Sequence, residues 1–132
     1  MAFDPTNNQS VFDRVLAHCR KQKVAAWNQE EARCEYRTAD GKKCAVGCLI
    51  GTRDYDRHFE GQSVHPDFDR PLERLLTAKG FDLYLLEELQ RAHDSGMPRQ
   101  GIAEPDILER MGLFEATMRV VAEHWNLRYT CP

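Results

Sequence analysis

The sequence predicts a mainly α domain of the α+β class, with four to five helices around one core and a small β-hairpin near residues 33–45. Apolar residues recur at helical spacing in several separate stretches of the chain. An Asp-Gly dipeptide, which is typical of tight turns, separates two short runs near the middle of the chain. A chain of 132 residues buries enough surface to fold without disulfides or metals, so residues 1–132 are predicted to form a single domain.

The first predicted helix begins at Ser10. Ser10 and Asp13 come close to the capping-box pattern, in which a hydroxyl and an acid satisfy free amide groups at a helix start. Basic side chains follow in the last turns, where the helix dipole favours cations. The residues predicted to face the core share one side of this helix: Val11, Phe12, Val15, Leu16 and Cys19.

The hairpin is predicted from the residues on either side of Asp40-Gly41. Residues 33–37 form the first strand and residues 42–45 the return strand. Glycine accepts a positive φ without steric cost, which makes this dipeptide a strong turn former. The turn therefore sets the register of the two strands.

An apolar segment and a long loop follow the hairpin. Residues 46–50 are predicted to form a short buried helical turn rather than a strand, because Ala45 and Gly47 suit close backbone packing. Residues 51–66 contain glycines, aspartates and a proline, and are predicted to be a loop. A loop of this length is uncommon in a compact domain unless it has a function.

Three more helices are predicted in the second half of the chain. The first of these helices is predicted to have its N-cap at Asp69 and to end at Gly80. The second has its predicted N-cap at Asp82 and ends at residues 95–98. The third is predicted to begin near Pro105, after a connector at residues 100–104. Their predicted core faces are Leu72, Leu75 and Leu76; Leu83, Leu85, Leu86, Leu89 and Ala92; and Ile107, Leu108, Met111, Phe114, Met118, Val121, Ala122 and Trp125. Gly112 costs about 1 kcal/mol relative to alanine inside a helix and predicts a kink or break.

The composition is that of a globular protein, with 42% hydrophobic and 30% charged residues. No run approaches the roughly 20 apolar residues of a membrane-spanning helix. The N-terminal residues lack a basic region followed by an apolar one, so no secretory signal is expected. A cytoplasmic location is therefore expected, where the five cysteines are free thiols or metal ligands before disulfides.

Charge is distributed unevenly along the chain. Residues 1–58 carry ten Lys and Arg against eight Asp and Glu, whereas residues 59–132 carry eight against thirteen, which gives the net charge of −3. An overall negative charge disfavours a general nucleic-acid binder. The basic excess lies with the hairpin half, and the acidic excess with the helices behind it.

Three of the cysteines, Cys34, Cys44 and Cys48, lie in or beside the hairpin. Cys34 and Cys44 are diagonal neighbours across the predicted strands, and Cys48 lies one helical turn beyond Cys44, so the thiols can converge. Zinc takes four thiolate or imidazole ligands, and His58 or His65 would be the fourth. The spacing C-x9-C-x3-C favours buried free thiols over zinc, and a Cys34–Cys44 disulfide is the third alternative. No cofactor is therefore expected, with zinc as the alternative.

A basic cluster on the hairpin and the following loop is suited to phosphates or to an acidic protein surface, and the predicted partner is a protein with an acidic surface. Aromatic side chains interleave with it and are predicted to be exposed anchors, with Phe59 as a further candidate. A solvated face that balances the acidic helices is the alternative. The predicted interaction residues are Arg33, Tyr36, Arg37, Lys42, Lys43, Arg53, Tyr55 and Arg57.

An enzyme is a third class, and the sequence does not favour it. Cys44 follows two lysines, which lower a thiol pKa, but no histidine stands at a recognisable position to act as its base. His93-Asp94 matches the ligand pair of metal-dependent phosphohydrolases. Further ligands would come from His58, His65 and Asp106. The simpler interpretation places His93 near a helix C-terminus, where the dipole favours its cation.

The pattern C-x-Y-R…G-x-x-C-A-[IV]-G-x-L-I runs from Cys34 to Ile50, and a second block is Leu-Gln-Arg-Ala-His-Asp at residues 89–94. In both blocks the chain resembles a group of small proteins encoded by phages and prophages. Here Gly51-Thr52 stands where the group has Pro-Asp, and the position of Cys48 varies in the group. The resemblance implies a viral accessory setting and no particular reaction.

We therefore expect a non-enzymatic phage or prophage accessory protein in the host cytoplasm, which binds and occludes a host or defence-system protein. Charge complementarity would set its association rate, and the interaction residues above would make the contact. The alternative is a small zinc-binding or ligand-sensing domain that uses Cys34, Cys44 and Cys48.

Overall fold

The computed structural model describes residues 2–95 and 106–132. Its α-helices are α1 (Asn8–Gln22), α2 (Pro71–Ala78), α3 (Leu83–Asp94) and α4 (Ile107–Trp125). Two short strands, β1 (Trp27–Asn28) and β2 (Arg33–Cys34), pair antiparallel, and the 3₁₀ helices η1 (Gly47–Leu49) and η2 (Arg57–Phe59) lie in the connection that follows. The predicted fold class, mainly α with a small β-hairpin, is confirmed.

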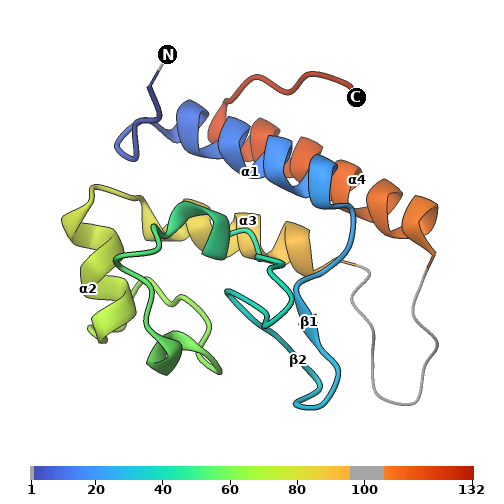
Figure 1. The fold of residues 1–132 in the computed structure, drawn as a ribbon. Coiled ribbons are helices and arrows are strands. Elements are labelled where there is room, and N and C mark those ends of the chain that lie inside the picture. Colours follow the sequence, from blue (N-terminus) through green and yellow to red (C-terminus); the bar gives the residue numbers. More distant parts are fainter. Residues whose placement is uncertain (1, 96–105) are drawn as a thin grey trace.

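Helix α3 occupies the centre of the fold. It packs against α4, α1 and α2, and α1 also contacts η1. In Figure 1, α1 and α4 run along one side of α3, while α2, the strands and the long connection lie on its other side. None of the described helices is long and apolar enough to cross a membrane.

Helix α1 buries the face that its sequence predicts. Val11, Phe12, Val15, Leu16 and Cys19 are all buried. The predicted start at Ser10 is wrong, because Asn7 is the N-cap residue and its side chain accepts a hydrogen bond from the Ser10 N–H at 3.0 Å. The Ser10 hydroxyl instead accepts from the backbone N–H of Asp4 at 3.1 Å, which ties the lead-in segment to the helix.

The hairpin forms with a different partner strand from the predicted one. β2 pairs with β1, with Trp27 opposite Cys34, whereas the Asp-Gly turn closes only a single bridge between Arg37 and Lys43. Gly41 has a φ of +89°, as the turn requires. The return segment is bound by side chains instead of a strand: Gln22 Oε1 accepts the N–H of Lys43 at 2.9 Å, and Gln90 Oε1 accepts the N–H of Val46 at 3.1 Å.

The long connection is ordered around one carboxylate. Glu60 accepts hydrogen bonds from the backbone N–H groups of Tyr36 and Arg37 at 2.8 and 3.1 Å, and from the Tyr55 hydroxyl at 2.5 Å. The predicted helical turn at residues 46–50 is confirmed as η1. The carboxylate of Glu60 therefore binds the loop to the backbone that follows β2.

Helices α2 and α3 follow the predicted order with one change. Arg70 is the N-cap residue of α2, not Asp69, whose carboxylate accepts from Arg74 Nε at 3.0 Å. Gly80 has a φ of +96° beyond the end of α2. Asp82 caps α3 as predicted, since its side chain accepts from the Tyr84 N–H. The buried residues include Leu72 and Leu76 in α2 and Leu85, Leu86, Leu89 and Ala92 in α3.

Helix α4 is continuous through Gly112, so the predicted kink or break is wrong. Its first turn also differs from prediction: Ile107 and Leu108 are 50% and 86% exposed. Arg110 is buried in their place, and its Nη1 donates to the carbonyl oxygens of His93 and Ser95, both at 2.8 Å. The predicted end of the preceding helix is described only at Ser95, and the predicted connector at 100–104 and start at Pro105 lie outside the described residues.

The C-terminal tail is held against α1 and α4 by Glu115. Arg20 donates to both carboxylate oxygens of Glu115, at 3.1 and 2.7 Å, and the Tyr129 hydroxyl donates to Oε1 at 2.5 Å. The guanidinium groups of Arg20 and Arg119 lie 5.5 and 5.2 Å from the centre of the Tyr129 ring. Glu115 therefore joins the first helix, the last helix and the tail.

Replacing Glu115 with glutamine is expected to lower the free energy of unfolding at neutral pH but not in strong acid. Burial opposes ionisation, but the hydrogen bonds from Arg20 and Tyr129 outweigh it, so the pKa of Glu115 lies below its ordinary value of 4.5. A carboxyl group with a lowered folded-state pKa stabilises above pH 4.5, and this contribution is lost as the pH falls through the lowered value. We expect Glu115→Gln to cost about 2 kcal/mol at pH 7 and almost nothing in strong acid.

Urea unfolding measured between pH 2.5 and pH 7 tests this prediction. Glu123→Gln is the matched control, because Glu123 is exposed on the same helix. If Glu115→Gln lowers the free energy of unfolding by the same amount over the whole pH range, the lowered pKa of Glu115 is contradicted.

Candidate functional site

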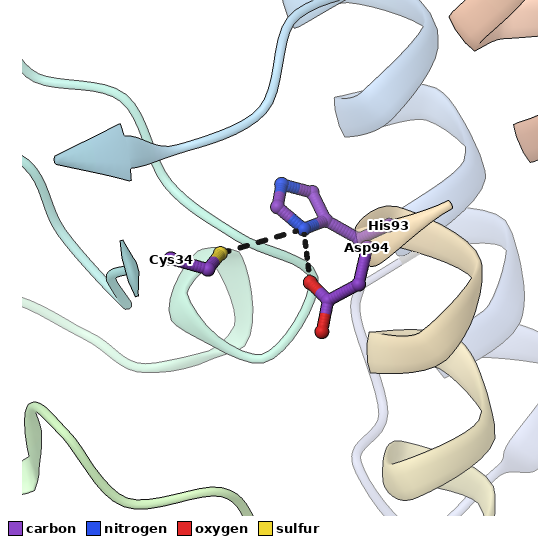
Figure 2. A group of neighbouring side chains, drawn as sticks. All are labelled: Cys34, His93 and Asp94. Atoms are coloured by element: carbon purple, nitrogen blue, oxygen red, sulfur yellow. Dashed lines mark hydrogen bonds and ion pairs between the residues drawn. The ribbon is translucent and has the colours of Figure 1, made fainter. Parts of the chain in front are cut away.

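Cys34, His93 and Asp94 come together where β2 meets the last turn of α3 (Figure 2). His93 Nδ1 lies 3.7 Å from Cys34 Sγ and 3.0 Å from Asp94 Oδ1. Within the described residues, this is the group of His, Cys, Asp and Glu side chains whose ligand atoms all lie within 4.8 Å of one another. It contains the residue types of a metal site and of a nucleophilic site.

The imidazole of His93 is fully buried, and both of its nitrogens are engaged. The backbone N–H of Ala26 donates to Nε2 at 3.3 Å, so Nε2 is an acceptor. The proton of the neutral ring is therefore on Nδ1, from which it is donated to Asp94. Burial disfavours a second proton, but the bonds to Asp94 and Cys34 raise the pKa of His93. The Ala26 N–H faces Nε2, so the single proton of the neutral ring stays on Nδ1.

This protonation pattern does not fit a metal ion. A ligating histidine binds through a bare nitrogen and usually donates its other N–H to an acceptor. Here the nitrogen that faces Cys34 and Asp94 carries the proton, and the other nitrogen faces a donor. Zinc at this cluster would require the ring to exchange its proton and to lose the bond from Ala26.

Of the predicted zinc ligands, Cys34 and Cys44 lie together, since a hydrogen bond joins their side chains, but Cys48 and His58 bond elsewhere. Cys44 is buried and its sulfur accepts the N–H of Gly47 at 3.3 Å, while the sulfur of Cys48 bonds to the Ala45 carbonyl at 3.0 Å. The ring of His58 is 95% exposed and bonds to Asp56. Of the four predicted candidates, only Cys34 belongs to the cluster that the structure forms.

The cluster does not fit a nucleophilic cysteine either. In a Cys-His-Asp triad the carboxylate and the sulfur lie on opposite ring nitrogens, so that the acid orients the base. Here both lie on Nδ1 of His93, and Nε2 is bound to the backbone of Ala26. The hydrogen bond with Cys44 and burial raise the pKa of the Cys34 thiol, and burial raises the pKa of Cys48 to about 12. Neither thiol is an activated nucleophile.

Gln90 connects the cluster to the rest of the fold. Its Nε2 donates to Asp94 Oδ1 at 2.9 Å and approaches Cys34 Sγ at 4.0 Å, while its Oε1 accepts the N–H of Val46. The polar groups of α3 thus bind β2, the segment before η1 and the connector at Ala26. The two sequence blocks at residues 34–50 and 89–94 meet at this cluster, since Cys34 belongs to the first block and Gln90, His93 and Asp94 to the second.

Several predicted interaction residues are not on the surface. Tyr36 is 5% exposed and its hydroxyl donates to the Gln62 carbonyl, and Phe59 is also buried, so the prediction of exposed anchors is wrong for both rings. Arg37 donates to the Ile50 carbonyl at 2.6 Å and its guanidinium lies 5.0 Å from the Tyr55 ring centre. These side chains hold the long connection together, because the connection has almost no backbone ladder.

The remaining basic residues are placed on or near the surface, but acids accompany them. Lys42 pairs with Asp40, and Arg33 lies 3.4 Å from the carboxylate of Glu35. Lys43 is half-buried, while Arg53 and Arg57 are exposed. The predicted basic patch is thus weakened by neighbouring carboxylates.

The exposed apolar side chains lie elsewhere. Six large hydrophobic residues are exposed within the described part of the chain, and four of them are on α4: Ile107, Leu108, Leu113 and Val120. The other two, Phe68 and Tyr84, lie on different elements. Sequence reasoning missed this surface because it assigned the first turn of α4 to the core and did not examine the opposite face. A second apolar stripe through Leu113 and Val120 was the available indication.

Comparison of the chain with known protein families, curated proteins and solved structures finds no match.

Proposed function

We propose that this is a non-enzymatic phage or prophage accessory protein that binds and occludes a host or defence-system protein, and that the outer face of α4 makes the contact. The observation that carries the proposal is the exposure of Leu113 and Val120, which are 45% and 63% exposed and lie seven residues apart on one face of α4. Apolar side chains gathered on one surface favour a protein contact, whereas single exposed ones need no explanation.

The polar cluster supports the non-enzymatic part of the proposal. Each polar group of His93 is bonded within the fold, and the thiol beside it has a raised pKa. The cluster therefore supplies no free base, no bare imidazole nitrogen and no thiolate. Its role is to hold the strands and the long connection against α3.

The accessory role and the viral setting are supported by the two sequence blocks that resemble phage proteins. The mode of action follows from the surface. A helix face that inserts apolar side chains into a partner covers the partner's own binding groove, and no reaction is needed. The basic loop residues Arg53 and Arg57 are exposed and remain candidates for secondary contacts.

Site-specific photo-crosslinking tests the proposal. A photoreactive residue at Val120 is expected to capture a defined protein from lysate of host cells, whereas the same residue at Tyr84 is not. Tyr84 is a matched control because it is 58% exposed, against 63% for Val120. Capture at Val120 should be lost when Leu113 is replaced with lysine. Equal capture at both positions, or none at Val120 with several defence systems present, would contradict the proposal.

A further inference from the structure

The outer face of α4 has a regular pattern of exposed residues. Five of its exposed positions follow one another at intervals of four, three, four and three residues: Glu109, Leu113, Ala116, Val120 and Glu123. Alternating steps of three and four residues place side chains in one line, as in the contact line of a coiled coil. We call these five residues the α4 seam. It has an apolar centre and a carboxylate at each end.

The two carboxylates of the seam are not used within the fold. Within the described residues, neither Glu109 nor Glu123 makes a side-chain hydrogen bond or an ion pair. Glu115, which lies outside the seam on the same helix, is by contrast bound by Arg20 and Tyr129. The neighbouring cation, Arg119, lies against the Tyr129 ring and donates to Cys131 Sγ at 3.7 Å. The seam therefore presents two unneutralised negative charges about 21 Å apart, at 1.5 Å per helical residue.

A second copy of the chain does not complement this pattern. An antiparallel pairing centred on Ala116 places Glu109 of one copy opposite Glu123 of the other, because both are seven residues from the centre. A parallel pairing places each glutamate opposite itself. Both arrangements bring like charges together at the two ends, which is unfavourable. The α4 seam of a second copy is therefore not the partner of this seam.

We infer that the seam binds an amphipathic helix of the partner protein whose apolar centre is bounded at each end by a lysine or arginine. The inference rests on the proposed function and adds the chemistry of the partner. Leu113, Ala116 and Val120 pack against the apolar centre, and Glu109 and Glu123 pair with the two cations. The small side chains of Ala116 and nearby Gly112 let the partner backbone approach, since a Cβ on Gly112 would meet nothing within 4 Å.

Two designed helical peptides test the inference. Both carry leucines at the spacing of the seam, and one has lysine at the two end positions where the other has glutamate. The wild-type protein is expected to bind the lysine-ended peptide about tenfold more tightly at low salt. The double variant Glu109→Lys/Glu123→Lys is expected to reverse that preference. Both replaced side chains are exposed, so the variant should fold, which a thermal melt verifies.

The control is Glu30→Lys/Glu31→Lys, which makes the same change in net charge at exposed positions in the turn between the strands. It is expected to keep the wild-type preference. Equal binding of the two peptides by the wild type would overturn the inferred partner charge and leave the proposed function standing. Absence of binding to either peptide, while Val120 still crosslinks a protein, would overturn the helical partner alone. Absence of both would overturn the proposed function as well.

Discussion

Replacing Gly47 with alanine is expected to destabilise the protein by about 3 kcal/mol or more, the upper range for an overpacked core. A Cβ at this position would lie 1.9 Å from the carbonyl oxygen of Tyr36 and 2.7 Å from its carbonyl carbon. The obstacle is backbone, and it cannot move freely. The amides on both sides of that carbonyl, at Tyr36 and Arg37, are bound to Glu60. The glycine is needed for the close approach and not for an unusual φ.

Replacing Gly112 with alanine is expected to have the opposite effect on stability to replacing Gly47. It lies inside α4, and a Cβ there would meet no atom within 4 Å. Gly112→Ala should therefore stabilise the protein by about 1 kcal/mol, the difference in helix propensity between the two residues. Urea unfolding of both variants measures the contrast. A Gly47→Ala variant as stable as Gly112→Ala would show that the approach of η1 to Tyr36 is wrong.

Replacing His93 with alanine is expected to cost about 4 kcal/mol, because it leaves a cavity and unpaired buried groups. The ring is fully buried, and its loss would leave the Ala26 N–H without its acceptor and Asp94 without its donor from Nδ1. The variants His93→Gln and His93→Asn distinguish the contributions of the two ring nitrogens. Asparagine can imitate the Nδ1 donor and glutamine the Nε2 acceptor, so each should recover part of the loss seen with alanine. Chemical denaturation measures the free energy of unfolding of the three variants, and His93→Ala is expected to have the lowest value.

The protonation of His93 is directly measurable. Nitrogen NMR of the imidazole is expected to show the Nδ1–H form. Protein purified without a chelator is expected to carry far less than one zinc per chain. An Nε2–H ring together with one zinc per chain, lost in Cys34→Ser, would contradict the assignment and would favour the zinc-binding alternative.

The apolar faces of α1 and α3 were predictable from the sequence, and so was the Asp82 cap. A repeat of 3.6 residues identifies a buried face without knowledge of what covers it, and a cap acts on amides two or three residues away. The fold class follows from the same local information. The predicted turn at Asp40-Gly41 also formed, since it depends on the φ of one glycine.

The first turn of α4 could not be predicted in this way. Periodicity assigned Ile107 and Leu108 to the core, yet the core takes Arg110. The reason is distant in sequence: the carbonyl groups of His93 and Ser95 at the end of α3 accept hydrogen bonds from the guanidinium of Arg110. The spacing of apolar residues within α4 contains no information about the carbonyl groups that lie free at the end of α3. Leu113 and Val120 lie outside the predicted core face and stay on the surface.

The sequence by itself determined the helices, most of their core faces and the presence of a tight turn, because each depends on residues within one or two turns. The tertiary structure decided which polar residues meet. It brought Cys34 to His93 across 59 positions, turned Tyr36 inward and left the α4 seam outside. Sequence reasoning grouped Cys34 with Cys44 and Cys48. The structure keeps the contact between Cys34 and Cys44 and adds His93 and Asp94 beside Cys34. The partner of a buried polar group is whichever group satisfies it, and the packing of whole elements decides which group that is.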